Sequence, residues 1–189
     1  MKTIKGPGIF LAQFIGSAPP FNTLDGLAEW AAGLGFKALQ LPCNHPAIFD
    51  LPQAAASQTY CDEITGRLAE HGLVISELST HLEGQLVAVN SAYDSAFDAF
   101  APAALRGNPA ARQQWAVEKV RQAAVASARL GLQAHATFSG SLAWPLFYPW
   151  PPHNPSRIDE AFDELARRWR PLLDLYDEQG IDLCYEIHP

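Results

Sequence analysis

The segment with the clearest chemical potential is the final octapeptide, DLCYEIHP (182–189). Successive side chains of a β-strand point to opposite faces, so Glu186 and His188 would share one face while Tyr185 and Ile187 share the other. A carboxylate and an imidazole two residues apart can form half of an oxygen–nitrogen site for Mn²⁺, Mg²⁺, Co²⁺ or Zn²⁺. The spacing alone leaves an alternative open, which is an exposed chain end with two solvated polar residues.

A second polar set lies in the segment SELSTHLEGQ (76–85). Glu77, Ser79 and His81 would share a face if a strand persists through them. His81, at the carboxyl end of that strand, could act as a general acid or base or could bind a substrate. It could equally begin a loop and bond to nearby backbone. Glu77 lies deeper and can be a buried structural carboxylate, whereas we expect Glu83 to be solvated.

Three further histidines have weaker signals. His45 follows a predicted strand and is a candidate substrate contact, but Cys43 and His45 have no second Cys or His pair that would complete a zinc site. His135 lies inside a predicted strand, which favours a hydrogen-bonded core histidine. His71 precedes a helix-ending glycine, where the helix dipole favours a cation and a structural role.

An aromatic, proline-rich loop follows the fourth predicted strand. Its rings could wall a sugar-binding cleft, because aromatic faces pack against the C–H faces of sugars. Packing against the loop's own domain or another subunit is the alternative. The rings belong to Trp144, which we take as a candidate substrate contact, and to Phe147, Tyr148 and Trp150.

Short apolar strands alternate with amphipathic helices along the chain. The predicted strands are 9–14, 37–41, 73–79, 133–138 and 182–188. The predicted helices are 24–34, 57–71, 109–130 and 156–179, and Pro171 is expected to kink or restart the last one. Single glycines link helices to strands, whereas the links from strands to helices are long. In parallel α/β proteins those long links surround the ligand site.

Two architectures fit this alternation. An open doubly wound sheet is one, although neither G-x-G-x-x-G nor G-x-x-x-x-G-K-[ST] occurs in the sequence. The other is a parallel (β/α)₈ barrel, which typically takes about 250 residues. On that interpretation, the 189 residues form a single incomplete domain with about five strands, truncated before the remaining βα units.

Composition narrows the class of protein. The net charge is −7, and 13 Lys and Arg are spread along the chain, which disfavours nucleic acid as a partner. No apolar run is long enough for a membrane span. Three cysteines without close pairing fit a reducing compartment, so we expect a cytoplasmic protein.

The segments YEIHP (185–189), SELSTHLEGQ (76–85), SGSLAWP (139–145) and RRWRPLLD (167–174) resemble the sugar phosphate isomerase/epimerase family of xylose-isomerase-like TIM barrels. The resemblance covers the whole chain but only the N-terminal portion of the family. It implies one divalent metal (Mn, Mg, Co or Zn), with Glu186 as the first ligand and as part of an acid/base pair. It also implies that His188 contacts substrate near the metal and that His81 lines the pocket.

The resemblance therefore implies metal-dependent isomerisation or epimerisation of a sugar or keto-sugar by proton transfer next to a carbonyl. The family's other metal ligands have no counterpart in this sequence. An inactive carbohydrate-binding or scaffold barrel is thus the alternative, and an abasic-site endonuclease relative is a further one. An unclosed barrel would expose strand edges, so a homo-oligomer is also an expectation.

Overall fold

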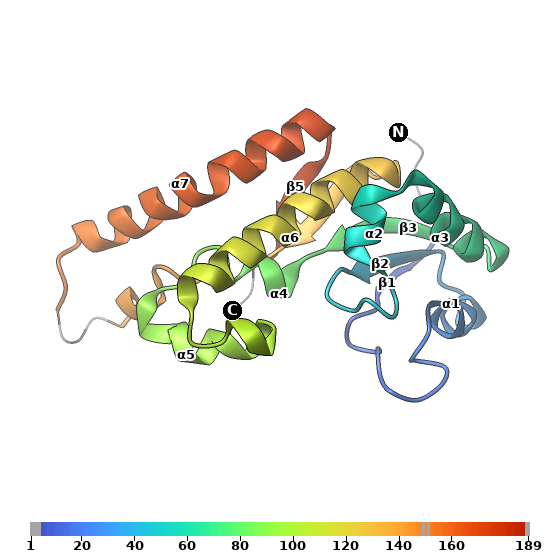
Figure 1. The fold of residues 1–189 in the computed structure, drawn as a ribbon, viewed down its shortest axis with the longest axis horizontal. Helices are drawn as coiled ribbons and strands as arrows, with labels where there is room; N and C mark the ends of the chain where they lie inside the picture. The colour runs from blue at the N-terminus through green and yellow to red at the C-terminus, as the bar shows by residue number, and fades with distance from the viewer. Residues whose placement is uncertain (1–4, 149, 151, 188–189) are drawn as a thin grey trace.

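The structure is a computed structural model that describes residues 5–148, 150 and 152–187, and these residues form one parallel sheet flanked by helices (Figure 1). Its strands lie in chain order: β1 (Gly8–Phe10), β2 (Ala38–Pro42), β3 (Val74–Ser79), β4 (Ala134–Thr137) and β5 (Asp182–Tyr185). In a doubly wound sheet the order reverses about the first strand. The observed order therefore confirms the incomplete barrel-type sheet and rules out the alternative.

The helices begin where capping side chains predict. Thr23, Ser57 and Asn108 each accept a hydrogen bond from a backbone N–H of the first turn that follows. They start α1 (Leu24–Gly33), α3 (Gln58–Glu70) and α6 (Pro109–Arg129). Three short helices do not follow from the sequence pattern: α2 (Leu51–Ala56), α4 (His81–Gly84) and α5 (Asp94–Phe97). The described part of the chain also contains four short 3₁₀ turns: η1 (Ser91–Tyr93), η2 (Asp98–Phe100), η3 (Ala103–Leu105) and η4 (Trp144–Leu146).

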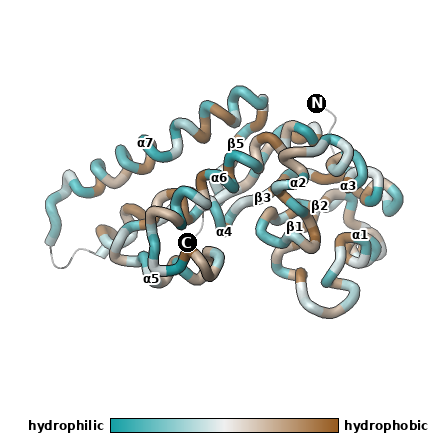
Figure 2. Tube along the Cα trace, in the orientation of Figure 1, coloured by the Kyte–Doolittle hydropathy of each residue, from teal (hydrophilic) through white to brown (hydrophobic). Residues whose placement is uncertain are grey.

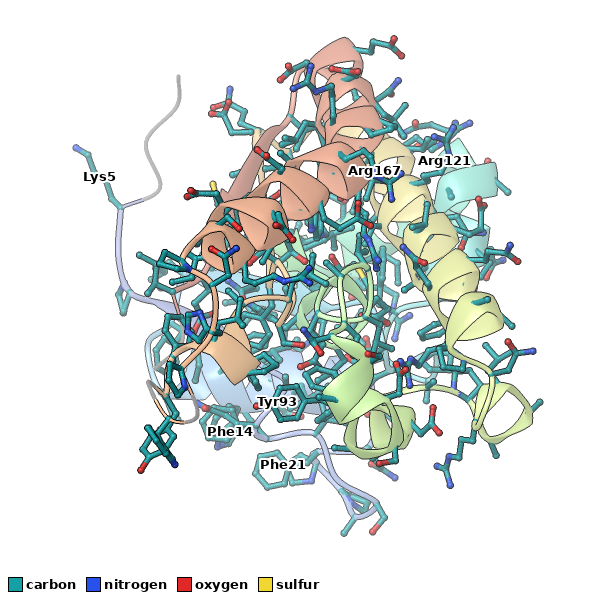
Figure 3. All side chains as sticks on the ribbon, turned by 90° about the vertical axis from the view of Figure 1, so that its left-hand side faces the viewer. Lys5, Phe14, Phe21, Tyr93, Arg121 and Arg167 are labelled. Atoms are coloured by element: carbon teal, nitrogen blue, oxygen red, sulfur yellow. The ribbon has the colours of Figure 1, made fainter. Side chains whose placement is uncertain are left out.

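The longest helix, α7 (Ser156–Gln179), continues through Pro171, so the expected restart at that residue is wrong. Proline removes the hydrogen bond to the carbonyl four residues earlier, which belongs to Arg167. Both residues are exposed, so water can satisfy that carbonyl and the helix need not end. Hydrophilic residues dominate α7 (Figure 2), and Arg167 extends from its outer surface, as Arg121 does from α6 (Figure 3). Among the described residues, no helix has both the length and the apolarity to cross a membrane.

Strand β2 shows how the two faces of the sheet differ. Leu39 and Leu41 are fully buried in the core that α1 and α3 share with the sheet. Ala38 and Gln40 alternate with them and line a cavity of about 370 Å³ on the opposite face. There Gln40 Nε2 donates to Oε1 of Glu77 at 2.6 Å. The helices therefore cover the outer, apolar face, as in a barrel wall.

A buried arginine orders the long link between β3 and α6. Arg112 is 1% exposed and donates to the backbone oxygen of Asp94 and to Oδ1 of Asp98, both at 2.6 Å. Its other terminal nitrogen pairs with Oδ1 of Asp94 at 2.5 Å. This ion cluster ties α5 and η2 to the start of α6, so the link is an ordered part of the domain.

A glycine allows α4 to approach β4 closely. A Cβ at Gly84 would lie 1.9 Å from Oγ1 of Thr137 and 2.6 Å from the carbonyl oxygen of Phe138. Only a residue without a side chain fits at that separation. The contact seats the four-residue helix α4, and its first residue, His81, against the end of β4.

Candidate functional site

The centre of the candidate site is a contact between His81 and Glu186, two residues separated by most of the chain. Nε2 of His81 lies 2.8 Å from Oε2 of Glu186. The His81 side chain is 8% exposed and that of Glu186 is 52% exposed. One partner is therefore held by the protein while the other reaches solvent, as a group that meets a ligand must.

Strand alternation explains how Glu186 reaches this position. Tyr185, the last residue of β5, packs edge-on against Trp169 of α7, with ring centroids 5.2 Å apart on the helix side of the sheet. Glu186 continues the ladder by donating its N–H to Thr137 O at 2.9 Å, and its side chain points the other way. The predicted strand extended to His188, but β5 ends at Tyr185, and His188 lies outside the described residues.

His81 sits where β3 has already ended. The chain turns into α4 after Thr80, yet His81 still faces the cavity that Ser79 lines. Its ring packs between Phe10 of β1 and Phe138 after β4, with centroid distances of 5.3 and 4.5 Å. Two aromatic walls therefore hold the imidazole in place.

The cavity around this pair has a volume of about 380 Å³ and lies at the carboxyl ends of the strands. His45, a candidate substrate contact, lines it, and partial burial lowers the pKa of its imidazole. Ser79, which the alternation of its strand places on the same face as His81, also lines it, and two further polar residues, Gln13 and Asn44, were not predicted. Each lies in or next to the link that follows a predicted strand, and that position is the signal that could have indicated them.

The structure places Trp144 elsewhere. Among the described residues, those that line the cavity do not include it. Its ring packs against Tyr93 and Phe97, each at a centroid distance of 5.9 Å, and it is 50% exposed. These contacts agree with the alternative of a loop packed on its own domain, and a substrate contact by Trp144 stays a prediction.

His135 is the core histidine that its sequence position predicted. It is fully buried, with Nε2 at 2.7 Å from Oγ1 of Thr80 and Nδ1 at 3.5 Å from Oγ of Ser127. Burial, reinforced by the charge of nearby His81, lowers the pKa of His135 to about 3. The imidazole is therefore neutral at neutral pH and takes no part in the cavity.

Glu83 corrects a prediction. We expected it to be solvated, but its side chain is buried and the residue is only 2% exposed. Burial raises the pKa of its carboxyl to about 7, an effect that Lys119 partly offsets. Its Oε2 has no hydrogen-bond partner among the described residues. The link after β2 and helix α6 enclose this side chain, and neither can be recognised from the local sequence.

The donors for a metal are few. Among the described residues, no three His, Cys, Asp or Glu side chains are grouped so that they could hold an ion. Glu186 is the carboxylate that faces the cavity next to an imidazole. The described residues therefore do not complete a metal site by themselves. All three cysteines are free thiols, with Cys43 and Cys61 buried and Cys184 exposed.

An in-order parallel sheet with helices on its outer face and polar side chains at the carboxyl ends of its strands defines one wall of a β/α barrel. The family model of the xylose isomerase-like TIM barrel matches residues 28–189, and the chain belongs to that family. None of the curated proteins compared with this chain matches it.

Solved structures share the fold at low identity. A xylose isomerase domain protein from Planctomyces limnophilus has a TM-score of 0.56 and 13% identity, covering 99% of this chain and 55% of its own. A xylose isomerase-like TIM barrel protein from Mycobacterium smegmatis in complex with magnesium has a TM-score of 0.54 and 18% identity, covering 98% and 56%. A D-psicose 3-epimerase, solved with D-fructose, has a TM-score of 0.52 and 13% identity, covering 95% and 51%. The chain thus spans about half the length of the structures that it matches.

Proposed function

We propose that this chain carries part of a sugar isomerase or epimerase that moves a proton next to the carbonyl of a sugar or keto-sugar. The observation that carries the proposal is the 2.8 Å contact between His81 Nε2 and Glu186 Oε2 inside a cavity at the carboxyl ends of the strands. The family to which the chain belongs and its similarity to a D-psicose 3-epimerase support the same chemistry.

Glu186 would remove and return the proton, because a carboxylate that reaches solvent can meet a substrate carbon and act as a general base. His81 would orient that carboxylate and donate a hydrogen bond to it or to a substrate oxygen. Phe10 and Phe138 pack against the imidazole of this residue, which is 7% exposed. His45 and His188 would contact the substrate, as the sequence predicts.

A divalent metal (Mn, Mg, Co or Zn) is part of the proposal, with Glu186 as the ligand from this chain. When bound, such an ion polarises the carbonyl and hydroxyl oxygens of the substrate. A divalent ion with about six ligands would take only one carboxylate and one imidazole from this chain. Water would then fill most of its coordination positions. We therefore expect the 189-residue chain alone to bind Mn²⁺ weakly.

A second candidate is a carbohydrate-binding or scaffold barrel without catalysis. The lack of a three-donor cluster among the described residues favours it. Under either candidate the ligand is a small sugar. The net charge of −7 argues against nucleic acid.

Deuterium exchange tests the proposal directly. Deuterium incorporation from D₂O at a carbon of the ketose is measured in the presence of Mn²⁺. The measurement is made with this chain and with a longer chain that contains it. In the active form, Glu186→Gln should lower exchange by about 100-fold or more, the usual contribution of a general base. Glu118→Gln, on the exposed side of α6, is the matched control and should exchange normally. Normal exchange in Glu186→Gln would remove Glu186 from the mechanism, and ketose binding without exchange in every form would favour the scaffold.

A further inference from the structure

A second cavity lies beside the candidate site. Its volume is about 450 Å³, and the link after β2, helix α4, the η2–η3 segment and helix α6 enclose it. Asn44 and Leu82 line both this cavity and the one that holds His81 and Glu186. The two cavities are therefore neighbours that share a wall formed by these two residues.

The second cavity has polar groups of both charges. Glu83 is among the residues that line it, is only 2% exposed, and has an Oε2 with no hydrogen-bond partner among the described residues. Lys119 of α6 faces the same space, and its positive charge acts on Glu83. An unpartnered buried carboxyl oxygen is costly, so a ligand that donates a hydrogen bond to it would gain binding free energy.

Aromatic and apolar surface makes up much of the remaining wall. Trp115 of α6 and Phe100 of η2 line the cavity, and Phe100 is 41% exposed. An aromatic ring offers a flat apolar surface to the C–H face of a sugar, while carboxylate, ammonium and amide groups bind its hydroxyls. Two carboxyl-bearing residues, Asp50 and Glu83, line the cavity together with Lys119. The hydroxyls of a neutral sugar ring can donate hydrogen bonds to the carboxyl oxygens and accept one from the ammonium group.

We propose that the second cavity is a subsite for a second sugar ring, so that the substrate is a ketose that carries a glycosyl unit. This inference rests on the proposed function, because it places the reacting ketose at His81 and Glu186. The glycosyl unit would pass over Asn44 and Leu82 and reach Glu83, Lys119 and Trp115.

Ligand-observed NMR titrations of the chain test this subsite, with D-fructose as the single-ring probe and lactulose, a galactosyl-fructose, as the two-ring probe. Lactulose should bind about tenfold more tightly than fructose, which corresponds to about one hydrogen bond to a charged group. Glu83→Gln should remove most of that gain and leave fructose affinity unchanged. Glu118→Gln is the matched control on α6, and Trp115→Phe is a second test that keeps an apolar ring.

The outcomes separate the two proposals. Equal affinity for the two sugars, or a lactulose gain that survives Glu83→Gln and Trp115→Phe, overturns the subsite and leaves the proposed function standing. Absence of binding by both sugars, to this chain and to a longer chain that contains it, overturns the proposed function together with the subsite. A gain for lactulose that Glu83→Gln abolishes supports both.

Discussion

Two histidines near the carboxyl end of the sheet have opposite surroundings. His135 pairs in register with Leu78 of β3, and His81 follows only three residues beyond that position. His135 is fully buried, and hydroxyl groups contact both of its ring nitrogens. His81 packs between two phenylalanines and has its Nε2 next to a half-exposed carboxylate.

The difference shows what makes one of two similar residues a candidate for catalysis. Burial fixes His135 as a neutral structural group, because its pKa of about 3 keeps it unprotonated in ordinary conditions. His81 is also held by its neighbours, but its Nε2 contacts a carboxylate that is 52% exposed and that a ligand can reach. The following predictions test this division, from the largest expected effect to the smallest.

Replacing His135 should mainly reduce stability. His135→Ala creates a buried cavity and leaves Oγ1 of Thr80 without its imidazole partner. We expect the free energy of unfolding at pH 7, measured in urea, to fall by about 3 kcal/mol. His71→Ala, at the end of α3, is the control and should change it by less than about 0.5 kcal/mol. A similar small loss in both variants would contradict the structural role.

Glu83 should make stability depend on pH. Its pKa is raised from 4.5 in the unfolded chain to about 7 in the folded one. Between these values the folded state keeps a proton that the unfolded state releases, so stability falls as pH rises from 4.5 to 7. Glu83→Gln should therefore match the original protein at pH 5 and exceed it by roughly 2 kcal/mol at pH 8. Urea unfolding at both pH values measures this difference in stability, with Glu118→Gln as the control. If the stability of the original protein and of Glu83→Gln depended on pH in the same way, the folded protein would ionise Glu83 at little cost in free energy.

Replacing His81 should mainly reduce binding. His81→Gln keeps a polar side chain but loses the imidazole that contacts Glu186. D-fructose affinity, measured by ligand-observed NMR, should fall about tenfold, and unfolding should change less than in His135→Ala. Unchanged affinity together with a large loss of stability would mean that His81 is structural, like His135.

Trp144 should affect neither property strongly. Trp144→Ala loses the ring contacts with Tyr93 and Phe97, which predicts a loss of about 1 kcal/mol of stability. Fructose affinity should stay unchanged. Trp150→Ala is the matched control, because that ring is 71% exposed and should contribute nothing measurable to stability. A clear loss of fructose affinity in Trp144→Ala would instead make the loop a sugar-binding wall.

The sequence predicts most of the sheet, because capping residues and glycines mark the helix ends and apolar alternation marks the strands. The prediction of strand ends is wrong where the chain turns before the apolar alternation stops. The first strand was predicted over 9–14 but ends at Phe10, since Phe14 donates its N–H to Leu11 O at 2.9 Å in a turn. Likewise, β5 ends at Tyr185 although the alternation continues.

The candidate site is harder to predict than the fold. Strand alternation indicated Glu186, and the end of a strand indicated His81 and His45, because these positions depend on local geometry. The burial of Glu83 depends on α6 and the link after β2, which are distant in sequence. Gln13 and Asn44 are ordinary polar residues, and only their position at the end of a predicted strand could have indicated their part in the cavity.

The close seating of Gly84 on Thr137 and Phe138 has a consequence for robustness. The contact with Oγ1 of Thr137 and the carbonyl oxygen of Phe138 sets how deeply α4 lies against β4, and with it the position of the His81 imidazole. A single methyl group added at position 84 would collide with Thr137 and Phe138 and move the His81 imidazole away from Glu186. Position 84 is therefore where a mutational scan should find function lost before the fold is.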